Sequence, residues 1–186
     1  DSMIEHLVNE IEHCLKNDLQ IAALTRALTL PDTCGKVYRP QGKVGERYIS
    51  WYNDHILNHQ REPLGGDPEC FLISGEVVYK LRCAMLHESN PAVTGTAESI
   101  TQFSLVWRPV SSCLRTTVDR CIGFNEKGEL QQHILSIDIV SLCHNICEEA
   151  LSYYRKNKEK FSFDYHIISV PDRLAKSFGV DNQINV

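Results

Sequence analysis

Apolar residues recur at three- and four-residue steps at the start of the chain, which is the spacing of amphipathic helices. A first helical region is expected at about residues 2–29, with Ser2 as its N-cap, because a serine hydroxyl accepts hydrogen bonds from the unpaired N–H groups of a first turn. The Asn17-Asp18 pair is expected to break or bend this region. Pro31 is expected to end it, and the segment P-D-T-C-G that begins there is typical of a turn.

The same spacing returns twice in the middle of the chain. One helix is expected at about residues 45–59 and another at about residues 74–89. Ser74 is the expected N-cap of the second helix, and Glu76 in its first turn is favourable at the positive end of the helix dipole. Pro91 disfavours helical geometry at the residue before it, so this helix should end close by.

The pattern becomes typical of strands over residues 100–137, where β-branched and aromatic residues partly alternate with polar ones. Two or three antiparallel strands are expected there, with Asn125-Glu126-Lys127-Gly128 as a hairpin turn. Asp138 is the expected N-cap of a long helix over about residues 138–158. A C-terminal tail follows over residues 161–186.

These elements predict a single domain over residues 1–186, of the α+β class and mainly helical. The chain is 42% apolar and long enough to bury a core of its own. It contains no internal repeat, low-complexity segment or convincing linker.

Charge and hydropathy exclude some classes of function. The net charge is −5 and the pI is near 5.9, so the chain has no overall positive field that would attract nucleic acid. This argues against an ordinary DNA-binding module, which has such a field. An enzyme that contacts a few phosphates needs only a local basic patch, so RNA stays possible. No apolar run is long enough to span a membrane and no signal-peptide pattern is present, which predicts a soluble, cytoplasmic protein.

Cysteine is frequent but does not form the closely spaced pairs of a zinc site. Because the chain is large enough to fold by burial alone, we expect reduced and mostly buried thiols, which behave as small apolar groups. The eight positions are Cys14, Cys34, Cys70, Cys83, Cys113, Cys121, Cys143 and Cys147.

An arginine and a histidine lie five positions apart in the stretch Y-K-L-R-C-A-M-L-H-E-S-N-P, residues 79–91. In a regular α-helix, at ~100° per residue, Arg82 and His87 would point ~140° apart, and neither would face the core. Tyr79 and Leu86 lie between them. This second apolar seam predicts a further packing partner, either the strands at 100–137 or another copy of the same helix.

The chemistry of the two side chains favours phosphate. Arg82 carries a planar fork of donors that matches phosphate oxygens. His87 falls in the last expected turn, where the helix dipole stabilises the imidazolium form. A cation beside a group that transfers protons is the minimum needed to cleave RNA through its own 2′-hydroxyl, and neither a metal nor a cofactor is expected.

The segment L-R-C-A-M-L-H-E-S-N, residues 81–90, resembles the R-x4-6-H motif of the HEPN superfamily (higher eukaryotes and prokaryotes nucleotide-binding). The resemblance implies a small helical bundle in which residues 100–137 are an insertion. Many members are metal-independent ribonucleases of defence and toxin systems. Their arginine and histidine meet across a dimer interface, which here implies a homodimer through the helix 74–89, with Arg82 and His87 as catalytic residues.

Two functions stay open at this point. The first is a HEPN-like homodimer that cleaves RNA, or binds RNA or a nucleotide. The setting that the resemblance implies is a bacterial defence or toxin-type system. The family often has asparagine directly after the arginine, where this chain has Cys83, and some members only bind nucleotides or act as scaffolds. The second function is a non-enzymatic interaction or regulatory module, in which Arg82 and His87 are structural and the strands bind a partner by edge pairing.

Three other constellations could carry chemistry. His55 and His59 have a spacing with which two imidazoles can share a metal, but the glutamate that would follow the first is absent, and solvated or hydrogen-bonded histidines are favoured. Arg47 with His55 is a looser version of the arginine–histidine pair. Trp51 and Tyr52 could stack on a base, although packing in the core is favoured.

Overall fold

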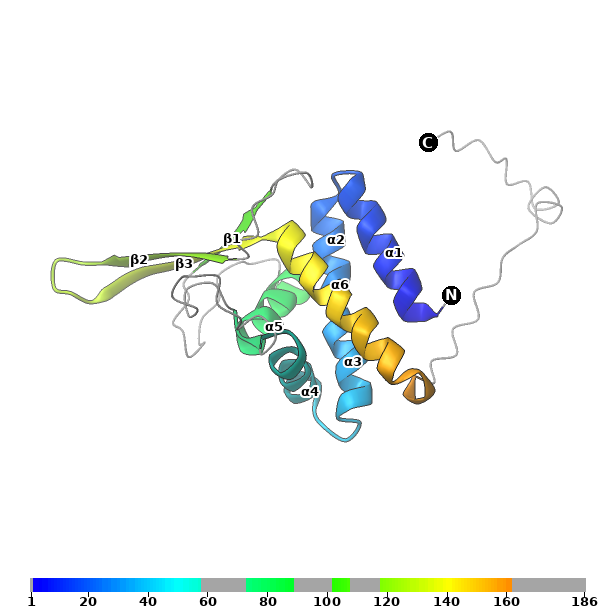
Figure 1. Ribbon diagram of the computed structural model, residues 1–186. Coiled ribbons are helices and arrows are strands. Elements are labelled where there is room, and N and C mark those ends of the chain that lie inside the picture. Colours follow the sequence, from blue (N-terminus) through cyan, green and yellow to red (C-terminus); the bar gives the residue numbers. More distant parts are fainter. Residues whose placement is uncertain (1, 58–72, 89–101, 108–117, 162–186) are drawn as a thin grey trace, which may run out of the picture.

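The computed structural model describes residues 2–57, 73–88, 102–107 and 118–161 (Figure 1). In these parts of the chain, five α-helices precede a three-stranded sheet, and a sixth and longest helix follows it. The architecture is therefore α+β and mainly helical, as the hydrophobic pattern predicts.

The first helix ends, and the second begins, at the break that the sequence predicts. Helix α1, Met3–Lys16, is capped by Ser2, whose hydroxyl accepts from the Glu5 N–H at 3.3 Å while the Glu5 carboxylate accepts from the Ser2 N–H at 2.8 Å. Asp18 then adopts a left-handed conformation with φ of 57°, which ends the helix. Helix α2, Gln20–Ala27, follows directly.

The prediction of a turn at P-D-T-C-G is wrong, because this segment lies in a third helix, α3, Leu30–Tyr38. Pro31 occupies the first turn of α3. A proline is tolerated there because the first N–H groups of a helix have no partner within the helix. Pro31 therefore marks the start of a helix, and Asp32 beside it lies in the first turn of that helix.

The two helices predicted in the middle of the chain are present, but each changes its geometry before it ends. Helix α4, Val44–Tyr52, continues as the π-helical turn η1, Asn53–Leu57. Helix α5, Gly75–Cys83, continues as the π-helical turn η4, Ala84–Glu88. The ends predicted at residues 59 and 89 lie outside the described residues.

Two glycines bring α3, α4 and α5 into close backbone contact. A Cβ atom at Gly35 of α3 would lie 2.7 Å from the carbonyl oxygen of Arg47 in α4. One at Gly75 of α5 would lie 2.8 Å from the carbonyl oxygen of Ile49, also in α4. Real Cβ contacts are longer than this, so any larger residue would push the helices apart. We call the region where these three helices meet the α3–α4–α5 junction.

The sheet has the order β1–β3–β2, formed by Gln102–Val106, Leu130–Asp138 and Val118–Phe124 respectively. Strand β2 pairs with β3 in antiparallel register, whereas β1 pairs with β3 in parallel register. The prediction of an all-antiparallel sheet is thus wrong for β1. The chain reverses direction before β2 and again after it, so β3 returns to the direction of β1 and lies beside it.

The hairpin turn between β2 and β3 forms where the sequence predicts it. The Asn125 side-chain oxygen accepts from the N–H groups of Lys127 and Glu129, both at 2.9 Å. Gly128 has φ of 75°, a conformation that glycine adopts without a steric penalty. The hairpin projects away from the helices (Figure 1). Ile122 and Phe124 on β2 are exposed.

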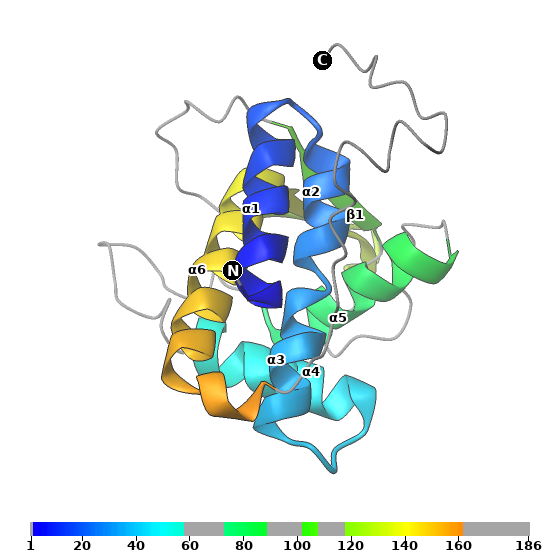
Figure 2. The ribbon, with the colours of Figure 1, turned by 90° about the vertical axis from the view of Figure 1, so that its right-hand side faces the viewer.

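Helix α6, Ile139–Lys156, is the central element of the core. Asp138 caps it as predicted, with its carboxylate accepting from the Ser141 N–H at 2.8 Å. Helices α1 and α2 run side by side (Figure 2), and α6 packs against both of them and against α3. Across the described ranges, no helix combines the length and apolar character needed to cross a membrane.

Candidate functional site at the α3–α4–α5 junction

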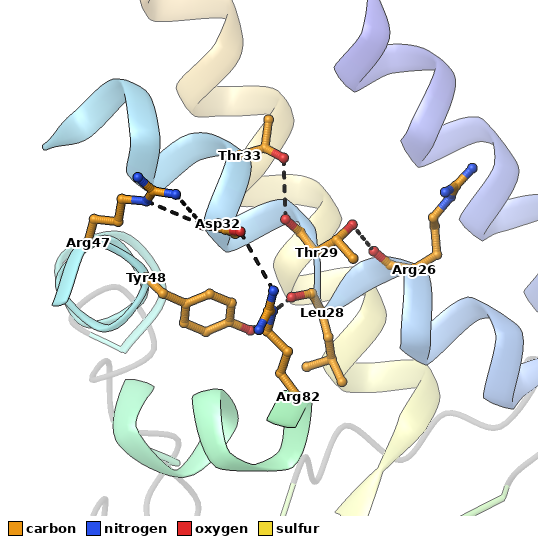
Figure 3. Close-up of polar contacts among 8 residues, drawn as sticks. All are labelled: Arg26, Leu28, Thr29, Asp32, Thr33, Arg47, Tyr48 and Arg82. Atoms are coloured by element: carbon orange, nitrogen blue, oxygen red, sulfur yellow. Dashed lines mark hydrogen bonds and ion pairs between the residues drawn. The ribbon is translucent and has the colours of Figure 1, made fainter. Parts of the chain in front are cut away.

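Arg82 lies in the last turn of α5, with its guanidinium directed into the α3–α4–α5 junction (Figure 3). Its Nη2 atom is 3.7 Å from Oδ2 of Asp32 in α3. Its Cζ atom lies over two aromatic rings, 5.9 Å from the centroid of Tyr48 and 5.8 Å from that of Tyr79. The side chain is only 15% exposed, so it is far less solvated than an ordinary surface arginine.

Asp32 has a second and closer partner in Arg47 of α4. The Arg47 guanidinium donates from Nε and Nη2 to Oδ1 of Asp32, at 3.3 and 3.1 Å. Arg82, at 3.7 Å from the other carboxylate oxygen, is beyond hydrogen-bonding distance. Two guanidinium groups thus share one carboxylate, and this triad of Asp32, Arg47 and Arg82 carries one excess positive charge.

The donors of Arg82 are not used up inside the junction. Its Nε atom is buried and has no hydrogen-bond acceptor among the described residues. A guanidinium has five N–H donors in a fixed planar arrangement, and buried donors normally find acceptors. Arg82 is therefore held in place by charge and by aromatic contact, with donors left over.

Tyr48 supports the underside of Arg82. Its hydroxyl donates to the carbonyl oxygen of Leu28 at 3.1 Å, and its ring lies 5.2 Å from that of Tyr79. Burial raises the pKa of the Tyr48 hydroxyl well above its ordinary value, and burial raises the pKa of Tyr79 as well. Both phenols therefore stay neutral at physiological pH and do not cancel the excess positive charge of the triad.

The backbone of position 87 lies in the π-helical turn η4, which directly follows α5. The side chain of His87 is outside the part of the chain that the structure describes. A π-helical turn has more residues than an α-helical turn, so each residue advances by less than ~100° around the axis. Position 87 is thus closer in angle to Arg82 than a regular α-helix would place it.

The apolar seam predicted on this helix has a partner within the chain at one of its two residues. Tyr79 packs on α4, where its ring lies against Tyr48 and beside Gly45; a Cβ atom at Gly45 would be 3.3 Å from the Tyr79 ring. The predicted partners were the strands or a second copy, so α4 was not anticipated. Leu86, in η4, is half-buried.

His55 lies in a cluster of aromatic rings. Its ring centroid is 4.8 Å from that of Tyr153, 5.3 Å from that of Tyr38 and 5.4 Å from that of Trp51. His59, with which it could have shared a metal, lies outside the described residues. Arg47 binds Asp32, whereas His55 lies against aromatic rings, so the two residues have different surroundings. Within residues 2–57, 73–88, 102–107 and 118–161, no group of three potential ligands is arranged to hold a metal ion.

Trp51 and Tyr52 are completely buried, which confirms that they pack in the core and leaves neither ring available to a base.

The cysteines that the structure describes with their side chains are free thiols, as expected. Burial raises the pKa of Cys147 to about 12, so this thiol stays protonated at neutral pH. The five free thiols are Cys14, Cys34, Cys83, Cys143 and Cys147.

Asp32 and its pairing with Arg47 were missed at the level of sequence, because Asp32 fell within a segment interpreted as a turn. A signal was present, since a proline followed by an aspartate is typical of a first helical turn.

Comparison with known proteins adds no assignment: no family model, curated protein or solved structure matches the chain.

Proposed function

We propose that this chain binds a phosphate group of RNA or of a nucleotide at Arg82, and that His87 transfers the proton in a metal-independent cleavage of RNA. The observation that carries the proposal is the state of Arg82. It is a largely buried arginine whose Nε donor has no acceptor among the described residues, and it lies beside a carboxylate that another arginine already binds. Arginine in such surroundings is suited to phosphate, because its planar fork can donate to two phosphate oxygens at once.

The reaction needs little beyond these groups. The 2′-oxygen of the RNA forms a bond to phosphorus as the bond from phosphorus to the 5′-oxygen breaks. The 2′-hydroxyl loses a proton, and the 5′-oxygen gains one. Arg82 would stabilise the charge on the phosphate, and His87 would accept or donate the proton. The products would be a 2′,3′-cyclic phosphate and a free 5′-hydroxyl.

The resemblance of residues 81–90 to the HEPN motif extends the proposal to a homodimer. Arg82 of one protomer would then act together with His87 of the partner subunit. Because Tyr79 packs on α4 within its own chain, the contact between copies would involve the η4 end, near Leu86. Light scattering at micromolar concentration should show a dimer, and a monomer would exclude a site shared between two chains.

The test is incubation of the purified protein with end-labelled RNA in the presence of EDTA. We expect cleavage by the wild type, and products that end in a 2′,3′-cyclic phosphate. His87→Ala should abolish cleavage without changing the melting temperature. His13→Ala is the matched control, because His13 is an exposed histidine on α1, and it should cleave like the wild type. Intact RNA with the wild type would exclude the nuclease function.

One observation favours a second candidate function, a non-enzymatic interaction or regulatory module in which Arg82 is structural. Arg82 is 15% exposed and has a carboxylate and two aromatic rings of its own chain around it. Under this alternative, Arg82→Gln would lower the melting temperature strongly and the wild type would bind no RNA. Under the first proposal, wild-type protein binds RNA, and Arg82→Gln loses binding by more than its loss of stability explains.

A further inference from the structure

The two arginines of the triad hold Asp32 in different ways. Arg47 donates two hydrogen bonds, and both go to Oδ1. Arg82 approaches Oδ2 at 3.7 Å and forms no hydrogen bond to it. Figure 3 shows Asp32 between the two guanidinium groups, with Arg47 and Arg82 reaching it from different helices. The Asp32 carboxylate is therefore bound mainly by Arg47.

This difference matters for any anion that would bind to Arg82. A carboxylate beside an arginine is a competitor for the donors that a phosphate would use. If Asp32 were bound to Arg82 as closely as it is to Arg47, a phosphate would have to displace it. At 3.7 Å, no such hydrogen bond has to be broken.

We infer that Arg47 is a positioning residue, which holds Asp32 back and so leaves the Arg82 donors for a phosphate group. The inference rests on the proposed phosphate-binding function of Arg82 and adds a role for two residues that lie 15 positions apart on neighbouring helices. Arg47 need not touch the ligand in this arrangement. Asp32, in turn, keeps Arg82 oriented when no ligand is bound.

The consequence is a dependence between two substitutions. Arg47→Gln releases Asp32, which then pairs with Arg82 and competes with phosphate. The affinity for RNA should fall by roughly tenfold, the order of one charge-assisted hydrogen bond. In an Asp32→Asn background the competing carboxylate of residue 32 is removed, so Arg47→Gln should change the affinity by less than about twofold.

The experiment measures the binding of a fluorescent 2′-O-methyl oligonucleotide, which lacks the 2′-hydroxyl and so is not cleaved. The proteins are the wild type, Arg47→Gln, Asp32→Asn and the double variant. Arg47→Lys is added as a milder change, because a lysine keeps the charge and can still bind Asp32; its loss should be smaller than that of Arg47→Gln. Melting temperatures identify any variant that fails to fold.

Side-chain NMR of the ¹⁵N-labelled proteins without ligand gives a second measurement, which does not depend on RNA. The Nε–Hε signal of Arg82 should shift between the wild type and Arg47→Gln, because Asp32 moves onto Arg82. The same signal should not shift between Asp32→Asn and the double variant. An Arg82 signal that is unchanged in Arg47→Gln overturns the inference.

The binding data can overturn it in another way. An equal loss of affinity from Arg47→Gln in both backgrounds would mean that Arg47 contacts the phosphate itself. If the wild type binds no oligonucleotide, the proposed function fails, and the NMR result alone decides whether Arg47 holds Asp32 away from Arg82.

Discussion

Two carboxylates of this protein each lie between two basic side chains, one on the surface and one inside the α3–α4–α5 junction. On the surface, Glu10 of α1 accepts from Arg26 Nε of α2 at 3.0 Å and lies 3.3 Å from His6. In the junction, Asp32 lies between Arg47 and Arg82. Nearly the same set of chemical groups is therefore present in two environments.

The environments differ in exposure. The side chains of His6, Glu10 and Arg26 are 51%, 39% and 50% exposed. Those of Asp32, Arg47 and Arg82 are only 27%, 17% and 15% exposed. Water and salt screen the surface group, so its ion pairs contribute little. The junction group has lost part of its hydration, so its charges are more costly to leave unpaired and more effective on a ligand.

The largest expected effect comes from opening the junction itself. Gly35→Ala places a Cβ atom 2.7 Å from the Arg47 carbonyl oxygen, so α3 and α4 must move apart. We expect a loss of about 3 kcal/mol in the free energy of unfolding, measured by urea denaturation. Gly42→Ala is the control, because its nearest contact would be 3.4 Å, and it should change stability by less than ~0.5 kcal/mol. Equal effects at both glycines would contradict the close packing of the junction.

Removal of each carboxylate compares the two groups directly. Asp32→Ala leaves two half-buried guanidinium groups without their shared partner, and we expect a loss of roughly 1–3 kcal/mol in the free energy of unfolding. Glu10→Ala should cost less than ~1 kcal/mol, because its partners remain solvated. A larger loss at Glu10 than at Asp32 would mean that burial does not control the strength of these groups.

The smallest effect is expected for the coupling between Glu10 and Arg26. A double-mutant cycle should give about 0.2–1 kcal/mol at low salt. In 1 M NaCl this coupling should become immeasurable, because the screening length falls to ~3 Å. The same cycle for Asp32 and Arg47 should retain most of its value at high salt. Equal salt sensitivity of the two cycles would contradict the difference in screening.

Local features of the fold could be predicted from the sequence, because the residues that produce them are close together in the chain. Ser2 and Asp138 cap the helices that follow them, and Asn125 orders the hairpin turn, all through contacts within four residues. The spacing of apolar residues likewise distinguishes the helices from the strands.

Features that depend on packing could not be predicted in this way. Pro31 is compatible with the end of one helix or the start of another, and only the surrounding packing decides between them. The parallel pairing of β1 with β3 depends on which edge of β3 is free. At the candidate site, Arg82 was predicted from a motif, but Asp32 and Arg47 lie on different helices, α3 and α4, which approach each other closely at Gly35. No local pattern in the sequence reveals that contact.

The most direct test of the central claim compares the two groups through their arginines. Binding of the uncleavable 2′-O-methyl oligonucleotide is measured for the wild type, Arg82→Gln and Arg26→Gln at the same ionic strength. We expect Arg82→Gln to weaken binding by at least about tenfold, because it removes the phosphate contact proposed for Arg82, and Arg26→Gln to bind within about twofold of the wild type. Equal affinities for the two variants would contradict the assignment of the phosphate site to Arg82.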